Sequence, residues 1–320
     1  MDDFLLPVIV GPTAVGKTAV AVNMAEYIGA EIISTDSRQI YQGMAIGTGA
    51  PSAEELRRVP HHLIGVISPI KRLSAGDYAR LAREAIIDIR NRGLIPLVVG
   101  GSGLYIKALT EGLAPIPPSD SLLRCEIEAE VDQLGMTAMI QRLAKIDPDY
   151  ASKVSERDRK RLVRALEVWK LTGKSFSAWH QEKRQDGFSK VVFWGLTRPR
   201  AELWDMIERR INNMISSGWL DEVKALAEAF GGLNHLPPPV TEGLGYRSIA
   251  AVLLGQLDPK TAVSRIVIAT RQFAKRQMTW FKADNRVKWN EQSGSDAVEC
   301  WTKWCLQDYQ TALGAKTHGF

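Results

Sequence analysis

The chain has 320 residues, of which 45% are hydrophobic and 24% charged, and its formal net charge at pH 7 is +5. This composition excludes a disordered or low-complexity protein, and the length suits one large or two modest domains. The basic excess is compatible with a polyanionic partner but does not decide it. The sequence contains no run of ~18 apolar residues, the length that is needed to span a membrane. The acidic pair Asp2-Asp3 before a short apolar run does not suit a secretory leader, so we expect a cytoplasmic protein.

The most informative motif lies at residues 11–18, which read Gly-Pro-Thr-Ala-Val-Gly-Lys-Thr. Residues 5–10 before it predict a buried strand and residues 19–28 after it a helix, which is the context that a G-x-x-x-x-G-K-[ST] phosphate loop requires. Backbone N–H groups of such a loop bind phosphate at the positive end of the helix dipole. Lys17 is expected to reach terminal phosphates and Thr18 to bind Mg²⁺. The residues expected to bind a di- or triphosphate are Gly11, Pro12, Thr13, Ala14, Val15, Gly16, Lys17 and Thr18.

Strand-like and helical patterns alternate after the loop. Apolar runs at residues 32–35, 63–67, 95–99 and 191–194 predict strands, and the apolar positions of residues 78–89 follow helical spacing. This alternation predicts an α/β fold of the phosphate-loop NTPase type, in which helices cover a parallel sheet on both faces.

Two polar features follow predicted strands. Asp36 has three candidate roles, as a Mg²⁺ ligand, as a general base or as a helix cap. Gly100-Gly101-Ser102-Gly103 is either a tight connection or a place where backbone approaches a ligand, with the Ser102 hydroxyl as donor. Because ligands of parallel sheets collect at the carboxyl ends of the strands, we expect both features to share one cleft with the loop.

The pattern changes near residue 115, after which the chain is charged and helical, with no strand-like run, up to residue 187. We therefore expect an all-helical insertion at residues 115–187. Residues 1–114 and 188–290 would form the phosphate-loop core, and residues 291–320 a tail of uncertain order.

Basic residues are patterned in two places. In the insertion, five of them are expected on one helical face, opposite apolar positions: Lys153, Arg157, Lys160, Arg161 and Arg164. Near the C-terminus, a second stripe comprises Arg271, Lys275 and Lys282, with Arg276 on an adjoining face. Such faces are usually just solvated, but two of them beside a phosphate-binding cleft favour contact with a nucleic-acid backbone.

Histidines and cysteines form no metal-site pattern. His61 and His62 are adjacent, so their side chains would point apart, and a structural role is favoured. Cys125 stands alone, and Cys300 and Cys305 are five residues apart, which suits reduced thiols in the cytosol.

The ordered motifs resemble the tRNA dimethylallyltransferase family, which prenylates an adenosine beside the anticodon. The resemblance runs from residue 7 to about residue 290 and is highly specific as a set. Besides the loop it rests on residues 36–44, 46–48, 59–63, 98–105, 164–168, 245–246 and 274–281. It implies transfer of the dimethylallyl group from dimethylallyl diphosphate to N6 of the adenosine 3′ of the anticodon. The substrates would be tRNAs that read codons starting with U, bound through the anticodon stem-loop, and diphosphate would be released with Mg²⁺ as cofactor.

The resemblance also implies residue roles. Asp36 would be the general base, Ser102 would bond near the bridging oxygen, and Lys17 and Arg210 would stabilise the leaving diphosphate. The tRNA contacts that carry over are Asp36, Ser37, Arg38, Gln39, Ser102, Arg124, Arg157, Asp158, Arg159, Lys160 and Arg161. From the second basic stripe we add Arg271, Lys275 and Arg276.

The chain departs from the family pattern at two places. Relatives commonly carry two arginines four residues apart where this chain has Met206 and Arg210, which leaves Arg210 as the diphosphate clamp and Arg209 as a candidate substitute. The family's Asn-Asp-x-x-Arg pattern begins with Arg157 here, so the local tRNA contact is expected to differ. The zinc finger of some eukaryotic relatives is missing, which indicates the bacterial type.

Three alternatives stay open at this level. A small-molecule or nucleotide kinase uses the same loop, with the insertion as its lid. A prenyltransferase acting on free adenine nucleotide would need neither basic face. A non-enzymatic nucleic-acid-binding module would leave Asp36 and Ser102 without a role. We expect a monomer without membrane contact.

Overall fold

The computed structural model describes residues 4–182, 184 and 186–314, so Asp2 and Asp3 lie outside the described residues. The chain forms two compact units. The larger unit comprises the chain up to Thr110 and from Phe188 on, and the helical unit runs from Glu111 to Gly187. Within the described ranges, no helix is both long and apolar enough to cross a membrane.

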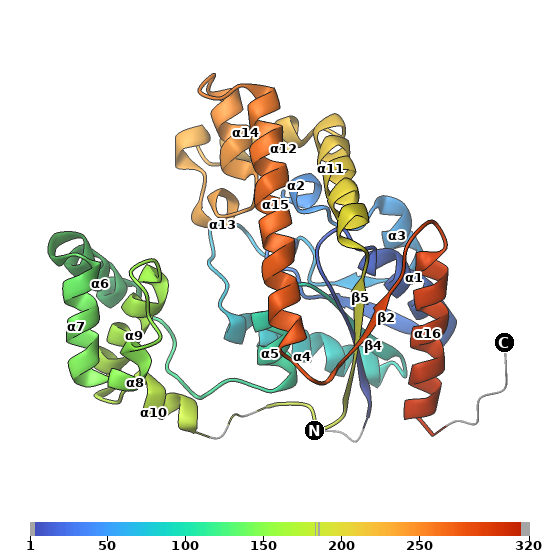
Figure 1. The fold of residues 1–320 in the computed structure, drawn as a ribbon, viewed down its shortest axis with the longest axis horizontal. Coiled ribbons are helices and arrows are strands. Elements are labelled where there is room, and N and C mark those ends of the chain that lie inside the picture. Colours follow the sequence, from blue (N-terminus) through green and yellow to red (C-terminus); the bar gives the residue numbers. More distant parts are fainter. Residues whose placement is uncertain (1–3, 183, 185, 315–320) are drawn as a thin grey trace. The chain divides into compact units, whose positions relative to one another are not determined.

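Six strands among the described residues form one parallel sheet in the larger unit (Figure 1). Their order is β3-β2-β4-β1-β5-β6. All five residues of β1 are buried, as expected for a parallel strand covered on both faces. The strands are β1 (Leu6–Val10), β2 (Ala30–Ser34), β3 (His61–His62), β4 (Ile95–Gly100), β5 (Val191–Thr197) and β6 (Val287–Glu291). The predicted α/β class is confirmed.

Helices cover both faces of this sheet. The crossover from β1 to β2 and that from β3 to β4 run in opposite directions along the sheet, so right-handed connections place α1 and α4 on opposite faces. Helix α16 packs beside α1, and α5 packs beside α4. The bounds are α1 (Lys17–Ile28), α4 (Ala75–Asn91), α5 (Gly103–Thr110) and α16 (Ala297–Ala312). Helix α4 confirms the amphipathic pattern, with Tyr78, Ala82, Ile86 and Ile89 buried.

A group of helices stands together beyond the carboxyl ends of the strands (Figure 1). Helix α11 follows β5 directly and packs against α15, while α12 packs against α14 and the short α2. These and the connecting elements are α2 (Ala45–Thr48), α3 (Ala53–Arg58), α11 (Arg200–Ser216), α12 (Trp219–Ala229), η1 (Leu233–His235), α13 (Pro238–Thr241), α14 (Tyr246–Leu253) and α15 (Pro259–Lys282).

The helical unit has a hydrophobic core of its own, formed by Ile127, Leu143, Leu162 and neighbouring side chains. Its described residues form helices and turns without a strand, which confirms the all-helical prediction. The Asp120 carboxylate begins the first helix by accepting hydrogen bonds from the N–H groups of Leu122 and Leu123. The helices are α6 (Ser121–Leu134), α7 (Met136–Ile146), α8 (Pro148–Ala151), α9 (Arg159–Thr172) and α10 (Phe176–Gln181).

Two strand predictions need correction. The strand expected at residues 63–67 is wrong, because Leu63 and Gly65 have left-handed backbone angles (φ 63° and 61°) that end the pairing after β3. Ile67 forms just an isolated bridge with Tyr41. Strand β6 was not predicted, since its sequence Val-Lys-Trp-Asn-Glu is largely polar and pairs with β5 at the sheet edge.

The residues after Glu291 also differ from the expected tail. Helix α16 packs against α1 and β5, and the Trp301 side chain is fully buried. Its indole nitrogen donates to the carbonyl of Asn290 (3.1 Å), and the guanidinium of Arg198 lies over its ring. The buried positions Ala297, Trp301, Cys305 and Tyr309 recur every four residues, which is an amphipathic pattern visible in the sequence. Residues 315–320 lie outside the described part of the chain.

Truncating Trp301 tests whether α16 belongs to the core. Trp301→Ala should lower the free energy of unfolding by about 3–5 kcal/mol, because it removes a fully buried aromatic side chain and leaves a cavity. Urea unfolding followed by circular dichroism measures the change. Gln307→Ala, at an exposed position of the same helix, should change it by less than about 0.5 kcal/mol. Equal effects of the two substitutions would mean that α16 is not part of the core.

Candidate active site

The phosphate loop connects β1 to α1 and holds its lysine folded back. Gly16 has φ +112°, which lets the chain turn sharply into the helix. The Nζ atom of Lys17 donates to the carbonyls of Gly11 (3.0 Å) and Pro12 (2.7 Å). Burial, with the nearby Arg210 charge as the second cause, lowers the pKa of Lys17 to about 7. An anion on the loop would therefore meet a lysine that gains charge as it binds.

Gln277 joins the phosphate loop to the glycine turn after β4. Its Oε1 accepts from the N–H of Thr13 (2.8 Å), and its Nε2 donates to the carbonyl of Gly101 (3.0 Å). Gln277 was not among the residues predicted for the site. The available signal was its place between Ala274 and Phe281 on the buried face of α15, where an unpaired amide would be costly.

Asp36 stands at the end of β2 and organises the turn that follows. Its Oδ1 accepts from the N–H groups of Arg38 (2.8 Å) and Gln39 (3.2 Å), as in the capping interpretation. The same residue lines both cavities described below. The Ser102 hydroxyl oxygen accepts from the N–H of Ser37 (3.1 Å), so the two features predicted to share one cleft lie side by side.

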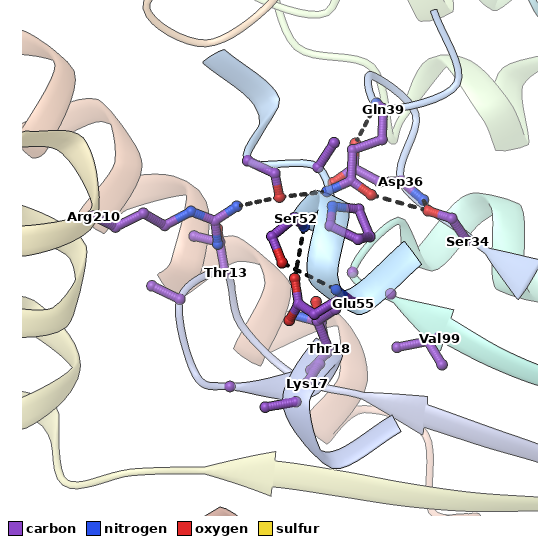
Figure 2. A pocket seen from close by; sticks show the side chains of 18 of the residues that line it. Thr13, Lys17, Thr18, Ser34, Asp36, Gln39, Ser52, Glu55, Val99 and Arg210 are labelled. Carbon is purple, nitrogen blue, oxygen red and sulfur yellow. Dashed lines mark hydrogen bonds between the residues drawn. The ribbon is translucent and has the colours of Figure 1, made fainter. Parts of the chain in front are cut away.

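Arg210 enters the site from α11, on the opposite side from Asp36 (Figure 2). Its Nη2 donates to the carbonyls of Thr48 and Gly49 (3.1 Å each), and its Nη1 lies 3.5 Å from Thr13 Oγ1. Burial lowers its pKa from the ordinary value.

Lys17, Asp36, Arg210 and Gln277 line a cavity of about 880 Å³, whereas Ser102 is not part of its wall. Met206 and the exposed Arg209 also line it, so the candidate substitute arginine does reach the cavity wall. Three further residues that were not predicted for the site also line this cavity: Ser52, Glu55 and His61. Glu55 lines this cavity together with Thr18 and Asp36, and all three are labelled in Figure 2.

A second cavity, of about 340 Å³, shares four lining residues with the first, Thr13, Asp36, Arg210 and the apolar Met214. Its other walls are largely apolar and include Ile207, Ile211, Trp219 and Phe273. An anion-binding loop, a carboxylate and an apolar chamber thus adjoin one another. This arrangement can hold the two ends of a molecule that is charged at one end and apolar at the other.

The basic residues predicted in the larger unit have different surroundings. Arg38 forms an ion pair with Glu242 (3.4 Å). Arg276 lines the second cavity. Arg271 donates to Glu208 (3.0 Å), and with Lys275 it lies over the Trp204 ring. The stripe lies on one helix, α15, and of its members Lys275 and Lys282 are exposed while Arg271 has Glu208 as an acidic partner.

The basic face predicted for the insertion was partly wrong. Helix α9 begins at Arg159, so Lys153 and Arg157 lie in the turns before it. The cause is local: Asp158 Oδ2 accepts from the N–H and hydroxyl of Ser155, which closes a turn there. Several of the other predicted cations have acidic partners: Arg124 with Glu128, Arg159 with Asp132 and Arg164 with Glu167. Arg157, Lys160 and Arg161 are exposed.

His61 and His62 both make contacts of the kind expected for the structural role that their adjacency favours. His62 Nε2 lies 2.6 Å from Glu31 Oε2, and His61 Nδ1 lies 2.7 Å from the carbonyl of Val59. In the described part of the chain, no group of three or more His, Cys, Asp or Glu side chains could hold a metal ion.

Comparison with known proteins decides the family. The sequence model of the IPP transferase family matches residues 39–284, and that of isopentenyl transferases matches residues 5–64. The chain belongs to the IPP transferase family. A tRNA dimethylallyltransferase from Halorhodospira halophila is 43% identical over 291 residues, which cover 88% of this chain and 93% of that relative. One from Geobacter sulfurreducens is 41% identical over 288 residues, 89% of this chain and 91% of the relative.

Solved structures agree with this membership. A tRNA isopentenylpyrophosphate transferase from Bacillus halodurans is 33% identical, has a TM-score of 0.68, and covers 98% of this chain and 99% of its own. A eukaryotic dimethylallyltransferase acting on tRNA has a TM-score of 0.82 at 23% identity, which supports the fold. Membership in the IPP transferase family confirms the predicted resemblance and makes the chain a prenyltransferase that modifies tRNA, whereas a kinase with the same loop would transfer a phosphoryl group.

The pKa of Lys17 predicts a pH dependence of anion binding. Above about pH 7 the free protein loses the Lys17 proton, whereas bound diphosphate favours the charged form, so binding must take up a proton. The dissociation constant for inorganic diphosphate should then rise by up to roughly tenfold per pH unit above that value. Calorimetric titration from about pH 6 to about pH 9 measures it.

Lys17→Met provides the control, because it removes the titrating amine and leaves the ionisation of diphosphate itself unchanged. The ratio of the variant's dissociation constant to that of the wild type should fall as the pH rises above 7. A ratio that stays constant across this range would show that Lys17 does not titrate on binding.

Proposed function

We propose that the chain transfers the dimethylallyl group of dimethylallyl diphosphate to N6 of the adenosine 3′ of the anticodon, in tRNAs that read codons starting with U. The observation that carries this proposal is the adjoining placement of the phosphate loop, Asp36 and the apolar cavity. The loop suits the diphosphate, and the apolar cavity suits an uncharged chain or a base that has been flipped out of its stack.

In the proposed reaction, N6 of the adenosine attacks C1 of the allyl group while the bond from C1 to the diphosphate oxygen breaks. Asp36 takes the proton that N6 loses, so the amine ends uncharged and the diphosphate keeps the bonding electrons. The carboxylate is suited to this step, because it lines both cavities and its Oδ1 is already oriented by two backbone N–H groups. Ser102, bonded to the same turn, would help to place the bridging oxygen.

Negative charge grows on the diphosphate as it leaves. Lys17, Arg210 and the N–H groups at the start of α1 are positioned to stabilise that charge where it develops. The Thr18 hydroxyl and the nearby Asp36 and Glu55 carboxylates line the same cavity and fit Mg²⁺ together with diphosphate oxygens. When bound, Mg²⁺ would supply further neutralisation of the leaving group.

Asp36→Asn tests the assignment of the base. The amide oxygen can still accept from Arg38 and Gln39, so the turn and diphosphate binding should persist, but prenyl transfer should slow by ~10²-fold or more. The assay mixes protein, Mg²⁺ and labelled dimethylallyl diphosphate with tRNA, or with AMP or ATP as alternative acceptors. Near-normal turnover of the variant would remove Asp36 from this role, and label on AMP alone would overturn the tRNA proposal.

The exposed cations just before and at the start of α9, Arg157, Lys160 and Arg161, are proposed to contact the tRNA backbone. Replacing both Arg157 and Arg161 with alanine should weaken tRNA binding and lower the slope of log affinity against log salt by about one unit for each lost phosphate contact. Diphosphate binding should not change. Filter binding across a salt series measures the slope, with Lys145→Ala on the exposed side of α7 as the control. An unchanged slope in the double variant would leave this surface merely solvated.

A further inference from the structure

The short helix α2 is held at its first turn by one carboxylate from α12. Glu222 Oε2 accepts from the N–H of Ile46 (2.6 Å), and its Oε1 accepts from the N–H of Gly47 (3.0 Å). The hydroxyl of Tyr246, on α14, donates to the same Oε1 (2.8 Å). Burial raises the pKa of Tyr246, so this hydroxyl keeps its proton and remains a donor. Glu222 thus ties α2 to two helices of the larger unit.

The other end of α2 contacts Arg210, one of the two cations of the active site. The carbonyls of Thr48 and Gly49 accept from Arg210, and the carbonyl of Gly49 also accepts from Gln39 (3.0 Å). Arg210 in turn lies beside Thr13 of the phosphate loop. Figure 2 shows the Arg210 guanidinium directed at this backbone rather than into open space. The place of the guanidinium therefore depends on the place of α2.

Close packing transmits a displacement from one end of α2 to the other. A Cβ atom on Gly47 would lie 2.0 Å from Trp219 Nε1, so the backbone of α2 lies directly against that indole. A Cβ atom on Gly49, where φ is +59°, would lie 1.9 Å from Arg210 Nη2. Because α2 has four residues and is closely packed at both ends, a displacement of its first turn should also move the carbonyls at its last residues.

We propose that Glu222 is a positioning residue for Arg210, acting through α2. The inference rests on the proposed role of Arg210 as the diphosphate clamp. Glu222 itself would not touch the substrate, because its oxygens are engaged by the backbone of α2 and by Tyr246. Charge matters here: a carboxylate accepts from all three donors, whereas the amide group of glutamine would turn a donor toward at least one of them.

A double-mutant cycle tests the inference, using wild type, Glu222→Gln, Arg210→Ala and the double variant. The first readout is the dissociation constant of inorganic diphosphate. Glu222→Gln should raise it about tenfold, the effect of losing hydrogen bonds to a charged group. Arg210→Ala should raise it at least as much, and the double variant should match Arg210→Ala within about twofold, because Glu222 would have nothing left to position.

The kinetic constants separate positioning from loss of folded protein. Positioning predicts a higher KM for dimethylallyl diphosphate in Glu222→Gln, whereas partial unfolding would lower the apparent kcat and leave KM unchanged. Glu228→Gln, at an exposed position of the same helix, should change neither constant. Tyr246→Phe removes one donor and keeps the ring, so it should raise KM in the same direction by about threefold. That variant carries the test if Glu222→Gln does not fold.

The outcomes distinguish this inference from the function on which it rests. If Arg210→Ala leaves diphosphate binding unchanged, the clamp role fails whatever Glu222 does. If Arg210→Ala weakens binding and the effects of the two substitutions add in full, Glu222 acts independently of Arg210 and the inference is wrong. An unchanged KM in both Glu222→Gln and Tyr246→Phe would also overturn it.

Discussion

Two cations share one cavity before any anion arrives, and the rest of the site is arranged around that fact. Lys17 and Arg210 are both buried away from water. Each offsets part of the free-energy cost of burying its charge by donating hydrogen bonds to backbone carbonyls. Carbonyl dipoles stabilise a buried charge less than a full negative charge does, so the pair remains poised toward an anion. The proposed affinity of the loop for diphosphate would thus reflect cationic groups that the folded protein has already removed from water.

This arrangement requires segments that lie far apart in the sequence to be held within hydrogen-bond distance. The parallel sheet brings the ends of β1, β2 and β4 to one edge, and Gln277 of α15 then ties the loop after β1 to the turn after β4. Arg210 comes from α11 and is placed by α2, which follows β2. Each strand end supplies one part of the site, and the helices beyond the sheet close it.

Local pattern was enough to predict the parts of the site that depend on short segments. The phosphate loop, Asp36 and Ser102 follow buried strands, and the topology rule for parallel sheets places them together. Gln277 and Glu222 were not predictable in this way, because their importance comes from the backbone groups that they contact, and those groups are 175 or more positions away in the sequence.

The errors in the prediction have physical causes of the same kind. The apolar residues 63–67 have the composition of a strand, but left-handed angles at Leu63 and Gly65 exclude it. The basic residues before α9 have helical spacing, yet the Ser155–Asp158 turn takes Arg157 out of the helix. In both places the backbone conformation of a few residues excluded the element that the residue pattern predicted.

The packing of α16 bears on when the site can exist during synthesis. The phosphate loop leaves the ribosome long before α16, but the carbonyl of Val15 accepts from Arg198 (3.1 Å), and the guanidinium of Arg198 lies over the Trp301 ring. A nascent chain that has not yet emerged as far as residue 301 carries the complete motif without the contacts that support it from behind. Such a chain contains the loop residues without the support that Arg198 and Trp301 give them, so the loop reaches its final arrangement only after α16 has been synthesised.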